Sequence, residues 1–112
     1  MESINLANKK QIEVNLNGKE VVFELCAKNI DYLQTKTKKP LTKILEEVKG
    51  NNISMTLQLI YSMASDKKTG KILGERFFKD FDDVSIIKNL TPIIQKLSES
   101  ELPEAKNENE KK

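Results

Sequence analysis

Residues 50–65, GNNISMTLQLIYSMAS, decide the fold, because they form an uncharged stretch in a chain of which 32% of the residues are charged. From Ile53 onward the stretch fits one α-helix at about 100° per residue. Apolar residues cover a wide arc of that helix: Ile53, Met55, Leu57, Leu59, Ile60, Tyr61, Met63 and Ala64. A neutral polar strip completes it: Ser54, Gln58, Ser62 and Ser65. A surface helix normally carries Lys or Glu there, so this helix is either the central core helix or one that also packs on a partner.

Length and composition limit the class of protein. A chain of 112 residues with a net charge of +2 forms one small domain, and its charge is too small to predict binding to nucleic acid or a membrane surface. There is no histidine, which removes the commonest general base and the usual zinc ligand. The single cysteine, Cys26, cannot form an internal disulfide, as is typical of a reducing cytoplasm. We expect neither a membrane span nor a signal peptide, because no sufficiently long apolar run is present.

An alternating pattern before the central stretch predicts a β-hairpin over residues 11–25. Apolar residues stand at positions 12, 14 and 16, and again at 21, 23 and 25, on either side of Asn17-Gly18. Asn-Gly suits a two-residue type I′ turn, because both turn positions need a positive φ. Such a turn pairs Val14 with Val21 and Ile12 with Phe23, which brings both apolar sets to one face. That face should cover helices, and the free edges of the hairpin can accept a strand from another subunit.

Two helices are expected between the hairpin and the central helix. Their apolar stripes consist of Cys26, Ala27, Ile30 and Leu33 in the first, and Leu41, Ile44, Leu45 and Val48 in the second. Pro40 separates the two helices, because the residue before a proline disfavours the α region and proline suits a helix start. Gly50 ends the second helix, and Asn52 caps the central one.

Two interpretations are open for residues 70–91. Leu73, Phe77, Phe81 and Val84 have helical spacing, although Gly74 weakens a helix there. The alternative is a loop over residues 70–79, followed by a helix that Asp80 or Asp82 caps. Because proline in a helix interior costs about 3 kcal/mol, Pro92 predicts a break at residues 89–91. We then expect Thr91 to cap a last helix over residues 92–98.

Together these elements predict a mainly α fold with an N-terminal β-hairpin, that is, an α+β domain of four to five helices packed on two strands. The domain covers residues 11–98 and follows a flexible N-terminus, residues 1–10. From Glu99 the composition shifts to ESELPEAKNENEKK, which offers little beyond Leu102 to bury. Residues 99–112 are therefore predicted to be a disordered charged tail.

No residue pattern predicts catalysis, a cofactor or a metal. Thr69-Gly70-Lys71 has the order found at the end of a phosphate-binding loop, but that motif requires Gly at position 65 and Ser or Thr at position 72. Asp80, Asp82 and Asp83 lack the glycine and the distal glutamate of a calcium loop, and helix capping explains them better. Cys26 has no histidine to activate it. We therefore expect a protein that is not an enzyme and uses no cofactor.

Two sets of residues are candidates for binding a partner protein. The first consists of Phe77, Phe78 and Phe81, three of the four phenylalanines in the chain. On a helix Phe78 points about 100° away from Phe77, so the three do not fit one narrow stripe. Core packing is the simpler explanation, and an exposed patch is the alternative. The second set consists of Ser54, Gln58 and Ser62, which with Ser65 offer a small, neutral surface to another subunit.

Seven lysines suggest a different class, a small nucleic-acid-binding regulator. They are Lys36, Lys38, Lys39, Lys43, Lys67, Lys68 and Lys71, which can in principle follow a phosphate backbone. The chain has few aromatic residues for base stacking, 5% of the total, and no helix-turn-helix or RNA-binding signature. Nucleic acid is therefore the weaker alternative to a protein partner.

The order of these signals resembles that of the tail assembly chaperones of long-tailed bacteriophages and related prophages. The matching segments are VNLNGKEVVFEL (14–25), CAKNIDYLQ (26–34), PLTKILEEV (40–48) and NNISMTLQLIYSMAS (51–65), followed by the acidic helix start at Asp82-Asp83-Val84. The resemblance covers about residues 11–98. The chain departs from the family in the helix after Pro92 and in having no tryptophan in the central helix, where Tyr61 is the available aromatic residue.

The resemblance implies a virus-encoded, non-enzymatic chaperone that acts in the host bacterial cytoplasm and is absent from the finished virion. It implies the tape measure protein as the client during tail assembly, and the tail tube protein as a further partner. It also implies self-association, as well as a longer form made by ribosomal frameshifting. We expect no membrane partner.

Overall fold

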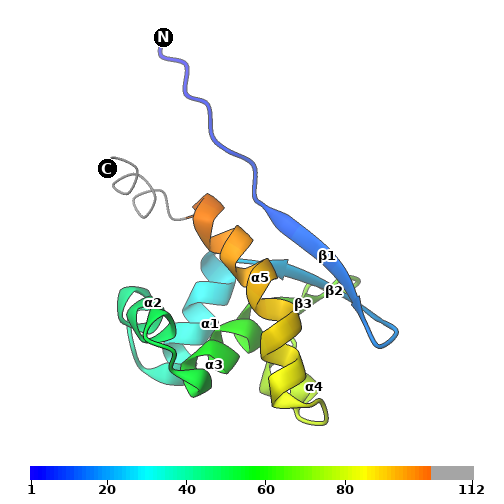
Figure 1. Cartoon of the computed structure of the whole chain (residues 1–112). Coiled ribbons are helices and arrows are strands. Elements are labelled where there is room, and N and C mark those ends of the chain that lie inside the picture. Colours follow the sequence, from blue (N-terminus) through cyan, green and yellow to red (C-terminus); the bar gives the residue numbers. More distant parts are fainter. Residues whose placement is uncertain (102–112) are drawn as a thin grey trace.

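The computed structural model describes residues 1–101, and residues 98–101 through their backbone alone. Within this range the chain forms five helices and three strands. In order they are β1 (Gln11–Leu16), β2 (Lys19–Glu24), α1 (Ala27–Thr37), α2 (Leu41–Lys49), α3 (Ile53–Met63), β3 (Ala64–Asp66), α4 (Gly74–Phe78) and α5 (Asp83–Glu101). The helices pack against an N-terminal antiparallel sheet (Figure 1), so the predicted α+β class is confirmed.

The predicted hairpin and its register are confirmed. β1 pairs antiparallel with β2, and Val14 lies opposite Val21. Asn17 and Gly18 both have positive φ, 50° and 95°, as the two-residue turn requires. The side-chain oxygen of Asn15 accepts a hydrogen bond from the backbone N–H of Gly18 at 2.8 Å and braces the turn.

The sheet has a third strand in addition to the two strands of the predicted hairpin. β3 pairs antiparallel with β2, with Ala64 opposite Phe23. The central helix, predicted through Ser65, ends instead at Met63, because the backbone of residues 64–66 bonds to the second edge of β2. β2 is therefore the middle strand, and both of its faces are buried. Among the described residues, only β2 pairs with β1, which leaves β1 at the edge of the sheet.

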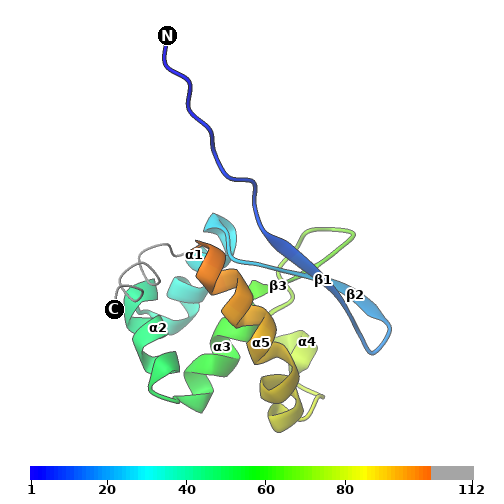
Figure 2. The ribbon, with the colours of Figure 1, turned by 45° about the horizontal axis from the view of Figure 1, so that its top comes forward.

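α3 is the centre of the domain, as its lack of charge predicts. It contacts α1, α2, α4 and α5 as well as strands β2 and β3. Figures 1 and 2 show α1 and α2 on one side of α3, and α4 and α5 on the other. Asn52 caps α3, since its side-chain oxygen accepts from the Met55 N–H at 3.0 Å. The core therefore surrounds α3 within a single chain.

The predicted separation of α1 and α2 is also confirmed. α1 ends at Thr37, and Lys38 follows it in the left-handed conformation at φ 59°. Pro40 is the N-cap of α2 and so stands one residue earlier than a first helical position. Gly50 caps the end of α2, while Asn51 supplies the positive φ, 67°, that reverses the chain.

The structure combines the two interpretations of residues 70–91. α4 is a short helix over Gly74–Phe78, and a separate helix, α5, follows. Asp82 caps α5, because its carboxylate accepts from the Ser85 N–H at 2.9 Å. Gly74 has a φ of 70°, and a Cβ on it would lie only 2.5 Å from the Tyr32 hydroxyl oxygen. Glycine is therefore required where α4 begins.

The predicted break at residues 89–91 was wrong, because α5 continues through Pro92 to Glu101. Proline removes one hydrogen bond, to the carbonyl of Lys88, but both residues lie on the exposed face, where water can hydrate that carbonyl. The opposite face of α5 is buried as one apolar stripe, made of Ile86, Leu90, Ile94 and Leu97. Burial of this stripe holds the helix together across Pro92. Thr91 lies inside the helix and does not cap a new one.

The two ends of the domain differ from each other. The predicted tail begins at Glu99, whereas α5 extends to Glu101, and the rest of that tail lies outside the described residues. Residues 1–10 form neither helix nor strand, are exposed throughout, and extend away from the domain (Figures 1 and 2). In residues 1–101 no helix combines the length and the apolar character needed to cross a membrane.

Candidate partner-binding groove

The three phenylalanines of the first predicted set lie together. Their ring centroids are 4.9 to 6.1 Å apart in edge-to-face arrangements. Phe78 is only 1% exposed and stacks on Tyr61 with centroids 5.2 Å apart, so it belongs to the core. Phe77 and Phe81 are half-buried. Of the three, therefore, Phe77 and Phe81 present surface to a partner.

The neutral strip of the second set does not form one surface. Ser54 is exposed and Gln58 half-buried, but Ser62 is 0% exposed, and Ser65 is buried in β3. α1 covers the buried part, since Asn29 donates from Nδ2 to the Ser62 carbonyl at 2.9 Å. The Ser62 hydroxyl donates to the Gln58 carbonyl at 2.8 Å. The lack of charge at Ser62 and Ser65 thus reflects burial within the chain, and only Ser54 and Gln58 can reach another subunit.

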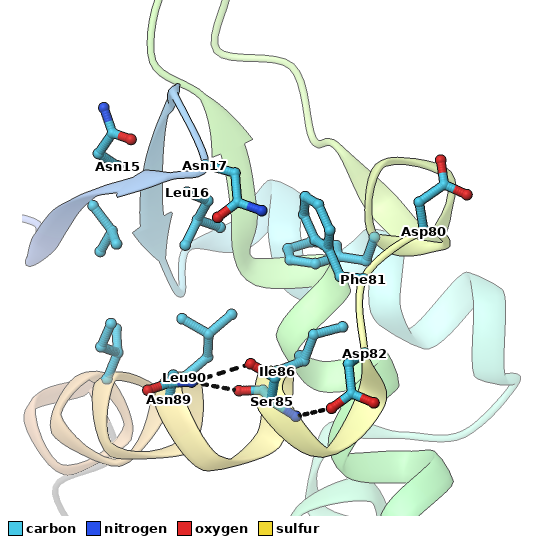
Figure 3. A pocket seen from close by; sticks show the side chains of 13 residues that line it. Asn15, Leu16, Asn17, Asp80, Phe81, Asp82, Ser85, Ile86, Asn89 and Leu90 are labelled. Atoms are coloured by element: carbon cyan, nitrogen blue, oxygen red, sulfur yellow. Dashed lines mark hydrogen bonds between the residues drawn. The ribbon is translucent and has the colours of Figure 1, made fainter.

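A groove lies between β1 and α5, and sequence reasoning missed it. Its volume is about 560 Å³. The hairpin forms one wall, the first half of α5 forms the other, and Phe81 closes one end (Figure 3). The lining consists of Val14, Asn15, Leu16, Asn17, Phe78, Asp80, Phe81, Asp82, Ser85, Ile86, Asn89, Leu90 and Ile93.

The groove exists because the apolar face of β1 is only partly covered. Ile12, Val14 and Leu16 are all half-buried, whereas the apolar residues of β2 are buried. α5 lies opposite this face and contributes Ile86, Leu90 and Ile93, of which Ile93 is itself half-buried. Both walls are thus apolar, and both leave apolar surface accessible between them.

The rim of the groove is polar and carries negative charge. Its charged residues are Asp80 and Asp82, and no lysine or arginine lines it within the described chain. Several of the polar groups are held by local bonds: Asn89 Nδ2 donates to the Ser85 carbonyl at 2.9 Å, and Asp82 caps α5. The arrangement is an apolar slot with fixed polar edges, which suits an apolar segment flanked by positive charge.

No sequence signal identified this groove in advance. The alternation in β1 shows which residues share a face, and the period of α5 shows its apolar stripe. Neither reveals how far apart the two faces lie, because that distance depends on how β2, α3 and α5 pack. Half-burial of a whole strand face becomes visible only in the tertiary structure.

The residues considered for catalysis or metal binding have structural roles. Gly70, at φ 78°, lies in a polar turn in which the Asp66 carboxylate accepts from the Lys68 N–H at 2.8 Å. Cys26 is the N-cap residue of α1, with its sulfur 3.0 Å from the Asn29 side-chain oxygen. Among the side chains of residues 1–97, no three acidic or cysteine side chains gather closely enough to hold a metal ion.

The seven lysines of the nucleic-acid alternative lie on separate parts of the fold. Lys36, Lys38, Lys39 and Lys43 lie in or between α1 and α2, and the other three lie in the segment after β3. Lys39 pairs with Glu47 at 2.9 Å, and Lys67 pairs with Glu13 at 3.2 Å. The neighbouring carboxylates reduce the positive potential that a phosphate backbone requires.

Electrostatics also stabilise the sheet behind the groove. The ion pair with Lys19, at 2.8 Å, and the N–H of Lys68 hold the pKa of Asp66 below its usual value. Burial opposes ionisation of Glu24, but hydrogen bonds from Gln11 and Lys28 keep its pKa lowered. In α3, burial raises the pKa of the Tyr61 hydroxyl, and the negative charges of Asp83 and Glu75 raise it further.

A comparison of the chain with protein families, with curated proteins and with solved structures gives no significant match. The function of the groove therefore has to be inferred from its shape and chemistry, together with the order of the sequence signals.

Proposed function

We propose that this protein is a tail assembly chaperone of a long-tailed bacteriophage or prophage, and that it binds an apolar segment of the tape measure protein between β1 and α5. The observation that supports this proposal is the groove itself, an apolar slot of about 560 Å³ with a polar, acidic rim. In this proposal the protein is not an enzyme and acts in the host bacterial cytoplasm.

The physical task of such a chaperone is to keep apolar segments of a long client out of water before the tail tube encloses them. Exposed apolar segments associate with one another, because burial stabilises by roughly 25 cal/mol per Å² of apolar surface. A groove that accepts a few apolar side chains reversibly prevents this association. The tail tube protein is a second candidate client of the same groove, and in this proposal the chaperone leaves before the virion is complete.

Individual residues have distinct parts in the proposed contact. Phe81 and Ile93 are half-buried and line the groove, so they can gain burial when a client side chain enters. Asp80 and Asp82 at the rim attract lysine or arginine beside the client's apolar segment. The rest of the lining shapes the slot.

The test is a pull-down of co-expressed tape measure protein with three forms of this chain: wild type, Ile93→Asp and Val84→Asp. Both substitutions place the same charge on α5, but Ile93 lines the groove, whereas Val84 is 71% exposed and lies outside it. We expect wild type and Val84→Asp to retain the client and Ile93→Asp to lose it. Thermal unfolding of each variant shows whether the fold is intact.

Two results would contradict the proposal. If wild type captures neither the tape measure protein nor the tail tube protein, the chaperone function is wrong. If a folded Ile93→Asp variant binds as well as wild type, the client binds elsewhere and the groove is not the site.

A further inference from the structure

The N-terminal arm, residues 1–10, carries apolar side chains that the rest of the chain leaves in water. Ile4 is 74% exposed and Leu6 is 84% exposed. Two residues apart, they point to the same side of an extended chain, about 6.6 Å from each other. Lys9 and Lys10 follow them, and Glu2 is the only acidic residue of the arm. The arm thus carries two exposed apolar side chains that are followed by two positive charges.

The groove between β1 and α5 is complementary to this arm. Its walls are apolar side chains of Val14, Leu16, Ile86, Leu90 and Ile93, and its rim carries the carboxylates of Asp80 and Asp82. Ile4 and Leu6 match the walls, while Lys9 and Lys10 match the charge of the rim. The outer edge of β1, beside the groove, also offers backbone groups to which an extended segment can bond.

We propose that the N-terminal arm of one copy of this chain lies in the β1–α5 groove of a second copy. The arm continues the direction of β1 away from its own domain (Figures 1 and 2). To enter its own groove it would have to reverse its direction before Gln11. A neighbouring copy receives the arm without any reversal.

This contact also bears on the client. If the tape measure protein binds in the same groove, the arm and the client compete for it, and this competition rests on the proposed function. A second copy would keep the groove covered until a client with a better apolar match displaces the arm. The test below uses the purified chain alone, so its outcome does not depend on the pull-down.

The experiment is sedimentation velocity over a range of concentrations with four full-length forms. They are wild type, the arm variant Ile4→Asp/Leu6→Asp, the groove variant Ile93→Asp and the control Val84→Asp. We expect the mass of wild type and of the control to rise with concentration, and the arm and groove variants to need at least about tenfold higher concentrations to associate. The arm substitutions lie outside every helix and strand, so they test the proposal even if Ile93→Asp unfolds.

A mixture provides the decisive comparison. The arm variant has an intact groove and the groove variant has an intact arm, so the mixture should form a complex at concentrations at which neither variant associates alone. Wild type that stays monomeric throughout would overturn the proposal and would leave the arm free or folded onto its own domain. An arm variant that associates as strongly as wild type would also overturn it, since the copies would then meet through another surface.

Discussion

Replacing Pro92 by alanine should stabilise the protein, because Pro92 lies inside the continuous helix α5. Alanine restores the backbone N–H that can bond to the Lys88 carbonyl and removes the steric conflict of the proline ring with the preceding turn. Proline in a helix interior costs about 3 kcal/mol relative to alanine. Exposure of Pro92 and Lys88 reduces this penalty in the native protein, since water can hydrate the carbonyl that proline leaves without a partner. We therefore expect Pro92→Ala to raise the free energy of unfolding by about 1–3 kcal/mol.

The assay is thermal unfolding followed by circular dichroism at 222 nm, with urea unfolding as a second measure. For a domain of this size, each kcal/mol of stabilisation raises Tm by about 4–8 °C. Gln95→Ala is the matched control, because Gln95 is another exposed residue of α5, and its replacement should change stability by less than about 0.5 kcal/mol. An unchanged or lowered Tm for Pro92→Ala would refute the continuous helix. It would favour instead the break at residues 89–91 that the sequence pattern predicts.

Two further predictions concern backbone strain and pH. Gly74→Ala should lower the free energy of unfolding by about 2–3 kcal/mol, because alanine there has a positive φ and its Cβ would lie 2.5 Å from the Tyr32 hydroxyl oxygen. In a Tyr32→Phe background that hydroxyl is absent, so the same substitution should lower the free energy of unfolding by only about 1–2 kcal/mol. Urea unfolding measures both, and equal costs in the two backgrounds would show that the hydroxyl contact is not responsible. Because the folded pKa of Asp66 is lowered, its ionisation stabilises the fold above the unfolded pKa, near 3.8, and that contribution is lost as the pH falls through the folded value. Asp66→Asn should therefore lose less Tm than wild type between neutral and about pH 3.

Most element boundaries could be predicted because the interactions that set them act over a few residues. Asn17-Gly18 determines the hairpin turn and hence the register of β1 and β2. Pro40 and Asn52 mark the starts of α2 and α3 through the capping positions they occupy. The lack of charge in residues 53–63 likewise predicted the central place of α3, because an uncharged helix must be covered on most sides.

The candidate site could be predicted only in part. Phe81 was among the residues selected from the sequence, and it lies at one end of the groove. Ser62 and Phe78 were selected too, but both are buried within the chain, because a neutral or aromatic residue looks the same in sequence whether its own chain or a partner covers it. Val14, Leu16 and Ile93 were identified as apolar, yet nothing local shows that they would face a gap.

The sequence by itself determined the α+β class, the hairpin register, the separation of α1 from α2 and the capped start of α3. The tertiary structure alone decided that Ala64 pairs with Phe23, which lies far from it in sequence, and that α5 stays continuous across Pro92. The tertiary structure also decided how much of the apolar face of β1 remains accessible to solvent. The physical reason is the range of the interactions: turns and caps depend on neighbouring residues, whereas strand addition, burial of the α5 stripe and the groove depend on segments that meet only once α3 is enclosed.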